Sequence, residues 1–386
     1  MKKIAILVFF TVGFFVHVWA CTGLIAGKQA TVDGSVLVTY SADSHTLYGA
    51  LTSSPAADWP KGSMRSIVEW DTNKPLGEIE QVEHTYAVMG NMNEHQLTVV
   101  ESTWGGRPEL VDTTGIIDYG SLMQLALERA KTAREAIKVM TGLVKKYGYY
   151  SSGESFTIAD PNEAWILDLI GKGPGRRGAV WVAVRIPDDC IAGHANYPRI
   201  HKIPMDDKEN CLYSPDVISF AREMGYFDGL NKDFSFARAY SPADFGALRA
   251  CDARVWSFFR KYDSTMDNYL PYVNGESAEP FPLYVKPSRK LSVQDMKEAM
   301  RDHFEDTPFD MTQDVGAGPF KVPYRFRPMS FEVDGKSYCM ERAIATQQTG
   351  FTLVGQMRNW LPDPVGGVLW FGVDDANTCV YIPMYC

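Results

Sequence analysis

The residue with the clearest chemical potential is Cys21, which lies next to a predicted cleavage point. Residues 1–20 have the pattern of a secretory signal peptide: Lys2 and Lys3 carry positive charge, Ile4–Val16 are largely apolar, and a small residue directly precedes the cysteine. Removal of this segment would make Cys21 the first residue of the mature chain. One residue would then supply a thiol nucleophile and, through an α-amine with a pKa near about 8, a general base.

The same segment allows two other interpretations of Cys21. Val18–Cys21 loosely resembles a lipobox, so the cysteine could be diacylated in a surface lipoprotein, although Trp19 fits that motif poorly. Cys21 could also form a disulfide, because disulfides persist in exported proteins. If Cys21 is instead a working thiol, six cysteines remain for as many as three bridges, with a pairing that the sequence does not give: Cys190, Cys211, Cys251, Cys339, Cys379 and Cys386.

Composition narrows the classes of protein and partner. The 386 residues are 45% hydrophobic and 22% charged, which is typical of a globular protein with a large core. A net charge of −9 without any basic run argues against binding to nucleic acid or to an anionic membrane surface. No segment after the signal peptide is long and apolar enough to span a bilayer. The expected location is therefore secreted or periplasmic, and the oligomeric state cannot be read from the sequence.

Familiar cofactor and metal motifs do not account for the chain. The sequence contains no GxSxG, HExxH, Walker A or CxxC pattern. Gly173–Gly178 matches GxGxxG, but the alternating residues 179–184 that follow predict a strand, so a hairpin turn is expected there rather than a dinucleotide loop. We therefore predict no cofactor and no metal.

The elements that must position Cys21 are predicted as alternating groups of strands and helices. Asp33-Gly34 predicts a hairpin turn between strands at 21–27 and 35–41. Further strands are predicted at 84–89, 97–103, 155–159, 164–170, 179–186, 342–356, 367–373 and 378–382. Helices are predicted at 119–147 (two, broken near Thr132), 216–224, 242–262 and 292–304. Because strand–helix–strand alternation is missing, we expect an α+β fold of two antiparallel sheets between helical layers, with residues 21–386 as one domain.

Several segments resemble peptidase family C69, the C69 dipeptidases. Residues 21–35 contain Cys-Thr, Gly-Lys and Asp-Gly-Ser in the order of that family's opening, and Asp43 matches its acidic residue after the turn. The Met-Asn-Glu-His turn around Asn93 and the Ala-Asn-Tyr-Pro-Arg-Ile segment around Asn196 are similar to two more of its motifs. Residues 356–370 resemble its closing loop and strand. The matches extend from residue 21 to near residue 383 and are weaker in the middle.

The resemblance implies an N-terminal-nucleophile (Ntn) hydrolase fold, a four-layer αββα sandwich, and hydrolysis of amide bonds in short peptides. Cys21 would attack the carbonyl, and Asp43 would orient its α-amine through a charge-assisted hydrogen bond. Asn93 and Asn196 would contribute to the oxyanion hole. Each of these three polar residues also has an ordinary structural interpretation, because Asp and Asn are common in turns.

The chain departs from the family at Tyr40, where many members and the related bile-salt and penicillin-V amidases carry an arginine beside the nucleophile. A tyrosine donates one hydrogen bond and brings no positive charge. Arg199 and Arg254 are further candidates for substrate binding, although Arg254 could be a solvated helix charge. Alternatives to a cysteine dipeptidase are an acylase acting on non-peptide amides, such as bile-salt conjugates or acyl-amino acids, and a surface lipoprotein that binds peptides without cleaving them.

Overall fold

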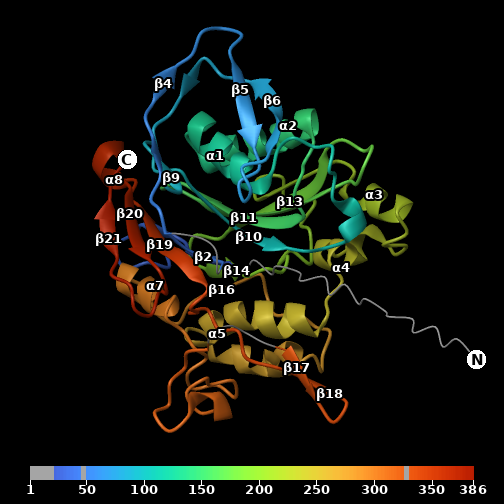
Figure 1. Cartoon of the computed structure of the whole chain (residues 1–386), viewed down its shortest axis with the longest axis vertical. Coiled ribbons are helices and arrows are strands. Elements are labelled where there is room, and N and C mark those ends of the chain that lie inside the picture. Colours follow the sequence, from blue (N-terminus) through green and yellow to red (C-terminus); the bar gives the residue numbers. More distant parts are fainter. Residues whose placement is uncertain (1–20, 45–48, 326–329) are drawn as a thin grey trace, which may run out of the picture.

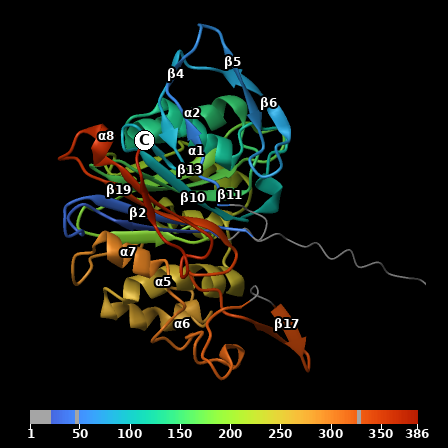
Figure 2. The same ribbon diagram turned by 60° about the vertical axis from the view of Figure 1, so that its left-hand side comes forward.

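The computed structural model describes residues 21–44, 49–325 and 330–386, so the predicted signal peptide lies outside the described residues. Two antiparallel sheets stack on each other, and helices pack against their outer faces (Figures 1 and 2). The α+β class with antiparallel sheets between helices agrees with the expectation from sequence. Among the described residues, no helix combines the length and the apolar character needed to cross a bilayer.

The first sheet has seven strands and carries Cys21 directly before β1, one of its interior strands. Its order is β16-β14-β1-β2-β19-β20-β21. In that order the strands are β16 (Tyr284–Val285), β14 (Ile191–His194), β1 (Thr22–Ala26), β2 (Val36–Asp43), β19 (Thr349–Met357), β20 (Val368–Val373) and β21 (Ile382–Met384). β1 pairs on one side with β2, its hairpin partner, and on the other with β14, which is distant in the sequence.

The second sheet has eight strands and faces the first. Its order is β15-β13-β12-β11-β10-β9-β8-β3. In that order the strands are β15 (Cys211–Tyr213), β13 (Ala179–Ile186), β12 (Ala164–Gly171), β11 (Gly153–Ala159), β10 (Thr98–Trp104), β9 (Met92–Asn93), β8 (Val88–Met89) and β3 (Ser53–Ser54). Three two-stranded sheets stand apart: β4 (Ala57–Asp58) with β7 (His84–Thr85), β5 (Met64–Val68) with β6 (Pro75–Glu80), and β17 (Ser330–Val333) with β18 (Lys336–Cys339).

Helices cover the two outer faces. The α-helices are α1 (Tyr119–Arg129), α2 (Ala133–Tyr147), α3 (Val217–Glu223), α4 (Phe236–Tyr240), α5 (Ala253–Arg260), α6 (Leu270–Val273), α7 (Val293–Ala299) and α8 (Asp363–Gly366). Short helical turns are η1 (Pro108–Leu110), η2 (Asn231–Asp233), η3 (Ala247–Asp252), η4 (Ser264–Tyr269) and η5 (Val315–Ala317). Helices α1 and α2 pack on the eight-stranded sheet, whereas α5 and α7 pack on the seven-stranded sheet.

The β1–β2 hairpin forms as its sequence predicts. Gly34 adopts a φ of 84°, the left-handed conformation that a glycine accepts readily, and Asp33 accepts a hydrogen bond from the Ser35 backbone N–H. Gly23 lies opposite His194 of β14, and a Cβ at Gly23 would come within 2.9 Å of the imidazole. The glycine therefore allows β14 to approach the strand that follows Cys21.

Other predicted elements are confirmed in position. Thr132 caps α2 by accepting a hydrogen bond from Glu135, which separates the two helices near the predicted break. Strands β11, β12 and β13 follow the predicted ranges closely. The Gly173–Gly178 segment connects β12 to β13, which pair antiparallel, so this GxGxxG match is a hairpin connection.

Some predicted boundaries are wrong. Residues 342–348 do not extend β19, because they form turns such as the one closed by the Thr349 N–H on the Thr346 carbonyl. The helix predicted at 292–304 ends at Ala299, since the chain leaves helical geometry and Phe304 has a φ of 64°. The strand predicted at 378–382 is also displaced, and β21 begins only at Ile382.

Further differences concern longer segments. The helix predicted at 242–262 is regular only as α5, after the π-helical η3 turn. The strand predicted at 84–89 is divided between β7 and β8, which pair in different sheets. The outlying hairpins β5–β6 and β17–β18 were not predicted, because their solvated strands lack a clear apolar pattern.

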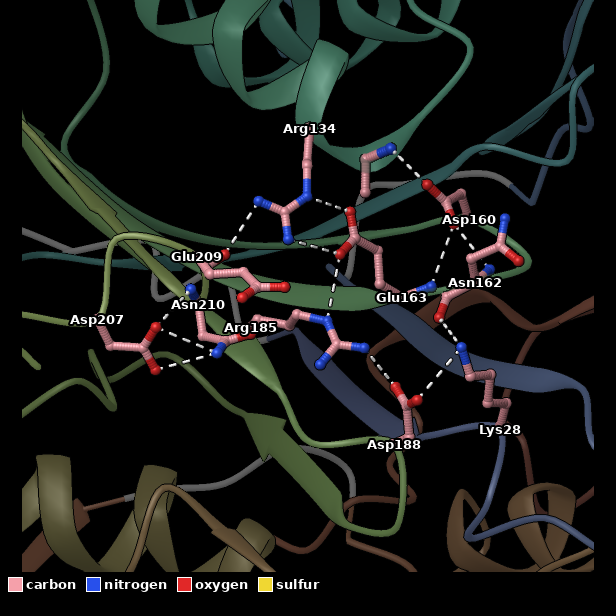
Figure 3. Close-up of polar contacts among 11 residues, drawn as sticks. Lys28, Arg134, Asp160, Asn162, Glu163, Arg185, Asp188, Asp207, Glu209 and Asn210 are labelled. Carbon is pink, nitrogen blue, oxygen red and sulfur yellow. Dashed lines mark hydrogen bonds and ion pairs between the residues drawn. The ribbon is translucent and has the colours of Figure 1, made fainter.

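An ion-pair cluster ties the β1–β2 loop to connections of the second sheet (Figure 3). Lys28 donates to the carbonyl of Asn162 at 2.8 Å and pairs with Asp188 at 3.2 Å. Arg185 joins Asp188 to Glu163, with distances of 2.5 and 3.2 Å. These contacts fix the relative position of the two sheets at one end.

All seven cysteines lie within the described residues, and each of them is a free thiol there. Within the same ranges, no group of three or more His, Cys, Asp or Glu side chains is placed to hold a metal ion.

Candidate active site

A pocket opens beside Cys21, between the start of β1 and the α1 helix. Its polar lining includes Cys21, Tyr40, Asp43 and Glu101, together with Thr52, Asn91 and Gln124. Its apolar and aromatic walls come from Trp70, Tyr119, Met123, Leu127, Phe351 and Phe371. Of the lining residues that the structure describes, none is a lysine or an arginine. The thiol therefore faces a largely apolar space whose charged side chains are acidic.

The Cys21 thiol is almost fully buried and lies close to a carboxylate. Its Sγ is 3.3 Å from Glu101 Oε1 and 3.6 Å from the Tyr40 hydroxyl. Burial raises the pKa of Cys21 well above its ordinary value, and the negative charges of Glu101 and Asp43 raise that pKa further. A hydrogen bond from the Asp43 backbone N–H and the contact with the Tyr40 hydroxyl act in the opposite direction. A base is therefore needed to generate the thiolate near neutral pH.

Glu101 lies beside the thiol but was not among the site residues predicted from the sequence. It lies on β10, is 2% exposed, and accepts a short hydrogen bond from the Tyr40 hydroxyl on Oε1. Glu154 on β11 lies one diagonal position away on the same sheet face. Burial first, and then the charge and hydrogen bond of Glu101, raise the pKa of Glu154 well above its ordinary value. Glu154 therefore holds a proton next to the Glu101 carboxylate.

Asp43, at the end of β2, is held by a second unpredicted residue. Arg342 donates a short hydrogen bond to Asp43 Oδ2, and the Thr349 hydroxyl donates to Oδ1 at 2.7 Å. Ser41 also donates to Oδ2, at 3.2 Å. Because Asp43 and Arg342 are both almost fully buried, this ion pair fixes the carboxylate in one orientation.

Arg254 lies beneath Cys21 rather than in solvent or in the pocket. Its guanidinium donates to the carbonyl oxygen of Cys21 at 2.8 Å and to the Thr22 hydroxyl at 2.7 Å. It also donates to Asn196 Oδ1 at 2.7 Å, while Asn196 Nδ2 donates to the Thr103 carbonyl at 2.6 Å. Burial and the nearby Arg342 lower the pKa of Arg254 to about 10. Arg254 thus connects α5 to the backbone of Cys21.

Asn93 bonds to backbone at the end of α1. Its Nδ2 donates to the carbonyls of Leu127 and Ala130, each at 2.8 Å, and its Oδ1 accepts from the backbone N–H of His95 and Leu97, each at 3.0 Å. These bonds use the donors and acceptors of the side-chain amide within the fold.

Arg199 lies in a buried ion pair away from the thiol pocket. It contacts Asp252 at 3.1 Å and donates to the carbonyl of Pro282 at 2.9 Å. The structure therefore brings three of the seven predicted site residues into the pocket, namely Cys21, Tyr40 and Asp43, and places four outside its lining, namely Asn93, Asn196, Arg199 and Arg254.

The chain matches the model of peptidase family C69 over residues 20–386. The chain belongs to peptidase family C69. Curated relatives of this C69 chain include a probable dipeptidase of Salmonella dublin, 27% identical, with 95% of this chain and 81% of the relative covered. A probable dipeptidase of Latilactobacillus sakei is 25% identical, with coverage of 95% and 74%. Dipeptidase A of Lactobacillus helveticus is also 25% identical, with coverage of 95% and 75%.

Proposed function

We propose that this C69 peptidase is a cysteine dipeptidase with an N-terminal nucleophile. In this proposal, cleavage after residue 20 makes Cys21 the first residue of the mature chain. The observation that carries the proposal is the position of the Cys21 thiol, in a pocket shared with Tyr40, Asp43 and Glu101. The relatives named dipeptidases support a short peptide as the substrate.

The reaction begins with attack of the Cys21 sulfur on the carbonyl carbon of the peptide bond. The α-amine of the same residue takes the thiol proton and later passes it to the departing amine, so that a thioester forms as the C–N bond breaks. Water then attacks the thioester, the α-amine accepts its proton, and the thiol is restored with release of the acid. One residue thus performs nucleophilic and proton-transfer steps.

Asp43 orients the α-amine in this proposal. Its fixed ion pair with Arg342 favours that role, because a carboxylate held from one side presents its charge in a constant direction. Arg254 positions the Cys21 backbone from below. The bonds that Asn93 and Asn196 already form with backbone groups favour structural support over oxyanion binding for both side-chain amides.

The proposal includes an Ntn-hydrolase assignment for the fold and export to the periplasm or the medium. Two antiparallel sheets between helices, with the nucleophile directly before an interior strand, support the first. The charged and then apolar pattern of residues 1–20 supports the second.

Intact mass and N-terminal sequencing of the mature protein, combined with turnover of a dipeptide panel, test the proposal. We expect a chain that begins at Cys21 with an unmodified thiol, and loss of turnover in Cys21→Ser. A mature chain with another first residue, or unchanged turnover in Cys21→Ser, would contradict it. Added diacylglycerol mass on Cys21 would indicate a lipoprotein, and turnover of bile-salt conjugates or acyl-amino acids without dipeptide cleavage would indicate an acylase.

A further inference from the structure

We propose that Glu101 binds the free α-ammonium group of the substrate's first residue, so that the enzyme requires an unblocked N-terminus. This inference rests on the proposed function and names the substrate class of the same site. The N-terminal residue of the substrate then supplies the acyl part of the cleaved bond, and Glu101 contacts the substrate directly.

The distances around the thiol support this assignment. A sulfur poised for attack lies about 3–3.5 Å from the carbonyl carbon. In the first residue of the substrate, the α-nitrogen is two bonds from this carbonyl carbon. Glu101 Oε1 is 3.3 Å from Cys21 Sγ, so this carboxylate is within hydrogen-bonding reach of that nitrogen. The nitrogen is a cation in an unblocked first residue and a neutral amide in every later one.

The charges of the pocket favour the same occupant. Asp43 has a cationic partner in Arg342, but no ion pair to Glu101 is formed by any lysine, arginine or histidine in residues 21–44, 49–325 and 330–386. A buried carboxylate without a counter-ion is costly. An ammonium group from the substrate would supply the missing positive charge.

Glu154 defines which carboxyl group carries this charge. Glu101 Oε2 and Glu154 Oε1 are both buried without a hydrogen-bond partner in the structure. A proton on Glu154, favoured by the raised pKa of that residue, satisfies both atoms and leaves the negative charge on Glu101. Because a protonated Glu154 has no net charge, it is not a counter-ion for Glu101.

The walls of the pocket select the rest of the first residue. Trp70, Phe351 and Phe371 line the pocket that the thiol also lines. An apolar side chain on the first residue would bury its surface against these rings, while its α-ammonium contacts Glu101. The substrate class is thus a dipeptide with a free N-terminus and an apolar first residue.

Binding is measured by calorimetry in Cys21→Ala, which lacks the thiol, with leucyl-alanine and N-acetyl-leucyl-alanine as probes. We expect the free dipeptide to bind roughly 10- to 100-fold more tightly than the acetylated one, as a charge-assisted hydrogen bond implies. Adding Glu101→Gln, which keeps the acceptor for Tyr40 but removes the charge, should abolish that preference. Adding Glu163→Gln is the matched control, because this carboxylate lies in the ion-pair cluster of Figure 3, outside the pocket lining, and the preference should remain.

Hydrolysis by the unsubstituted protein separates this inference from the proposed function. Equal binding of both probes, absence of binding, or a preference that survives Glu101→Gln would overturn the inference even if leucyl-alanine is cleaved. Selective binding without any cleavage would instead overturn the dipeptidase proposal and leave ammonium recognition supported. If Glu101 served only the enzyme's own α-amine, Glu101→Gln would weaken turnover without changing the binding preference, which also counts against the inference.

Discussion

The guanidinium of Arg254 donates a 2.8 Å hydrogen bond to the carbonyl oxygen of Cys21, which joins helix α5 to the residue that carries the thiol. The same side chain reaches Thr22 and Asn196, so one arginine connects the first strand to the segment after β14. Both ends of this contact are buried. The position of the thiol therefore depends on a residue that does not line the pocket.

Arg254→Lys should lower kcat more than it raises KM. A lysine cannot reproduce the several fixed donors of a guanidinium, so the Cys21 backbone loses part of its support. We expect a decrease in kcat of up to about 100-fold, as a small misplacement of a reacting group can cause. Steady-state kinetics on a dipeptide measure this. Arg260→Lys in the same helix is the control, since Arg260 pairs with the exposed Asp267, and equal losses in both variants would contradict the prediction.

Arg342→Met should destabilise the fold by leaving the Asp43 charge buried and unpaired. Removing one partner of such a pair typically costs about 3–5 kcal/mol of unfolding free energy. The double variant Asp43→Asn with Arg342→Met should lose less than the sum of the single losses, because the charge and its partner are removed together. Urea unfolding curves measure all three variants. Additive losses would show that the two side chains do not interact energetically.

The reactivity of the Cys21 thiol should rise with pH above the range of an ordinary cysteine. Burial and the nearby Glu101 and Asp43 charges raise its pKa, so the thiolate forms only at higher pH. Glu101→Gln removes one of these charges and should lower the thiol pKa, giving faster alkylation at neutral pH. Iodoacetamide labelling followed by mass spectrometry of the Cys21 peptide checks both statements. Slower labelling in Glu101→Gln, with Glu163→Gln unchanged, would refute the electrostatic argument.

His194 should make the protein sensitive to acid. Burial, and then the charges of Arg254 and Arg199, lower the pKa of His194 from 6.5 to about 3 in the folded state. Unfolded chains bind this proton below about pH 6.5, so the contribution of His194 to stability is lost as pH falls from there towards 3. The slope for one group is at most about 1.4 kcal/mol per pH unit.

His194→Gln removes this titration, and Gln can still bond to Ser102 and Thr157, the present partners of the imidazole. Urea unfolding between pH 4 and 7 should therefore show a shallower pH dependence in the variant than in the unsubstituted protein. Parallel curves for the two proteins would contradict a buried neutral histidine.

Local patterns sufficed for the elements that hold Cys21. The Asp33-Gly34 turn, the Thr132 cap and the alternation in β11 to β13 are each encoded within a few residues, and the structure agrees with them. The strand predicted from residue 342 was wrong at its beginning, since β19 starts only at Thr349. Arg342 pairs with Asp43, and the residues that follow form turns rather than pairing with a neighbouring strand.

The partners of the thiol could not be predicted in the same way. Glu101 lies within an otherwise strand-like run, and its carboxylate meets the Cys21 thiol only in the folded chain, because the two residues are 80 positions apart in the sequence. Both Arg199 and Arg254 were candidates for substrate binding, yet one pairs with Asp252 and the other holds the Cys21 carbonyl. Such differences arise from contacts between residues far apart in the chain, which spacing does not encode.

The interior position of β1 has a consequence for how the protein is made. Its neighbours β2 and β14, the Arg254 contact, and the Arg342 support for Asp43 come from segments spread over most of the chain. Pairings between distant segments form slowly during folding. The site is therefore complete only after the C-terminal region has been synthesised and packed. A partly translated chain contains Cys21 but lacks the contacts that Arg254 and Arg342 provide around it.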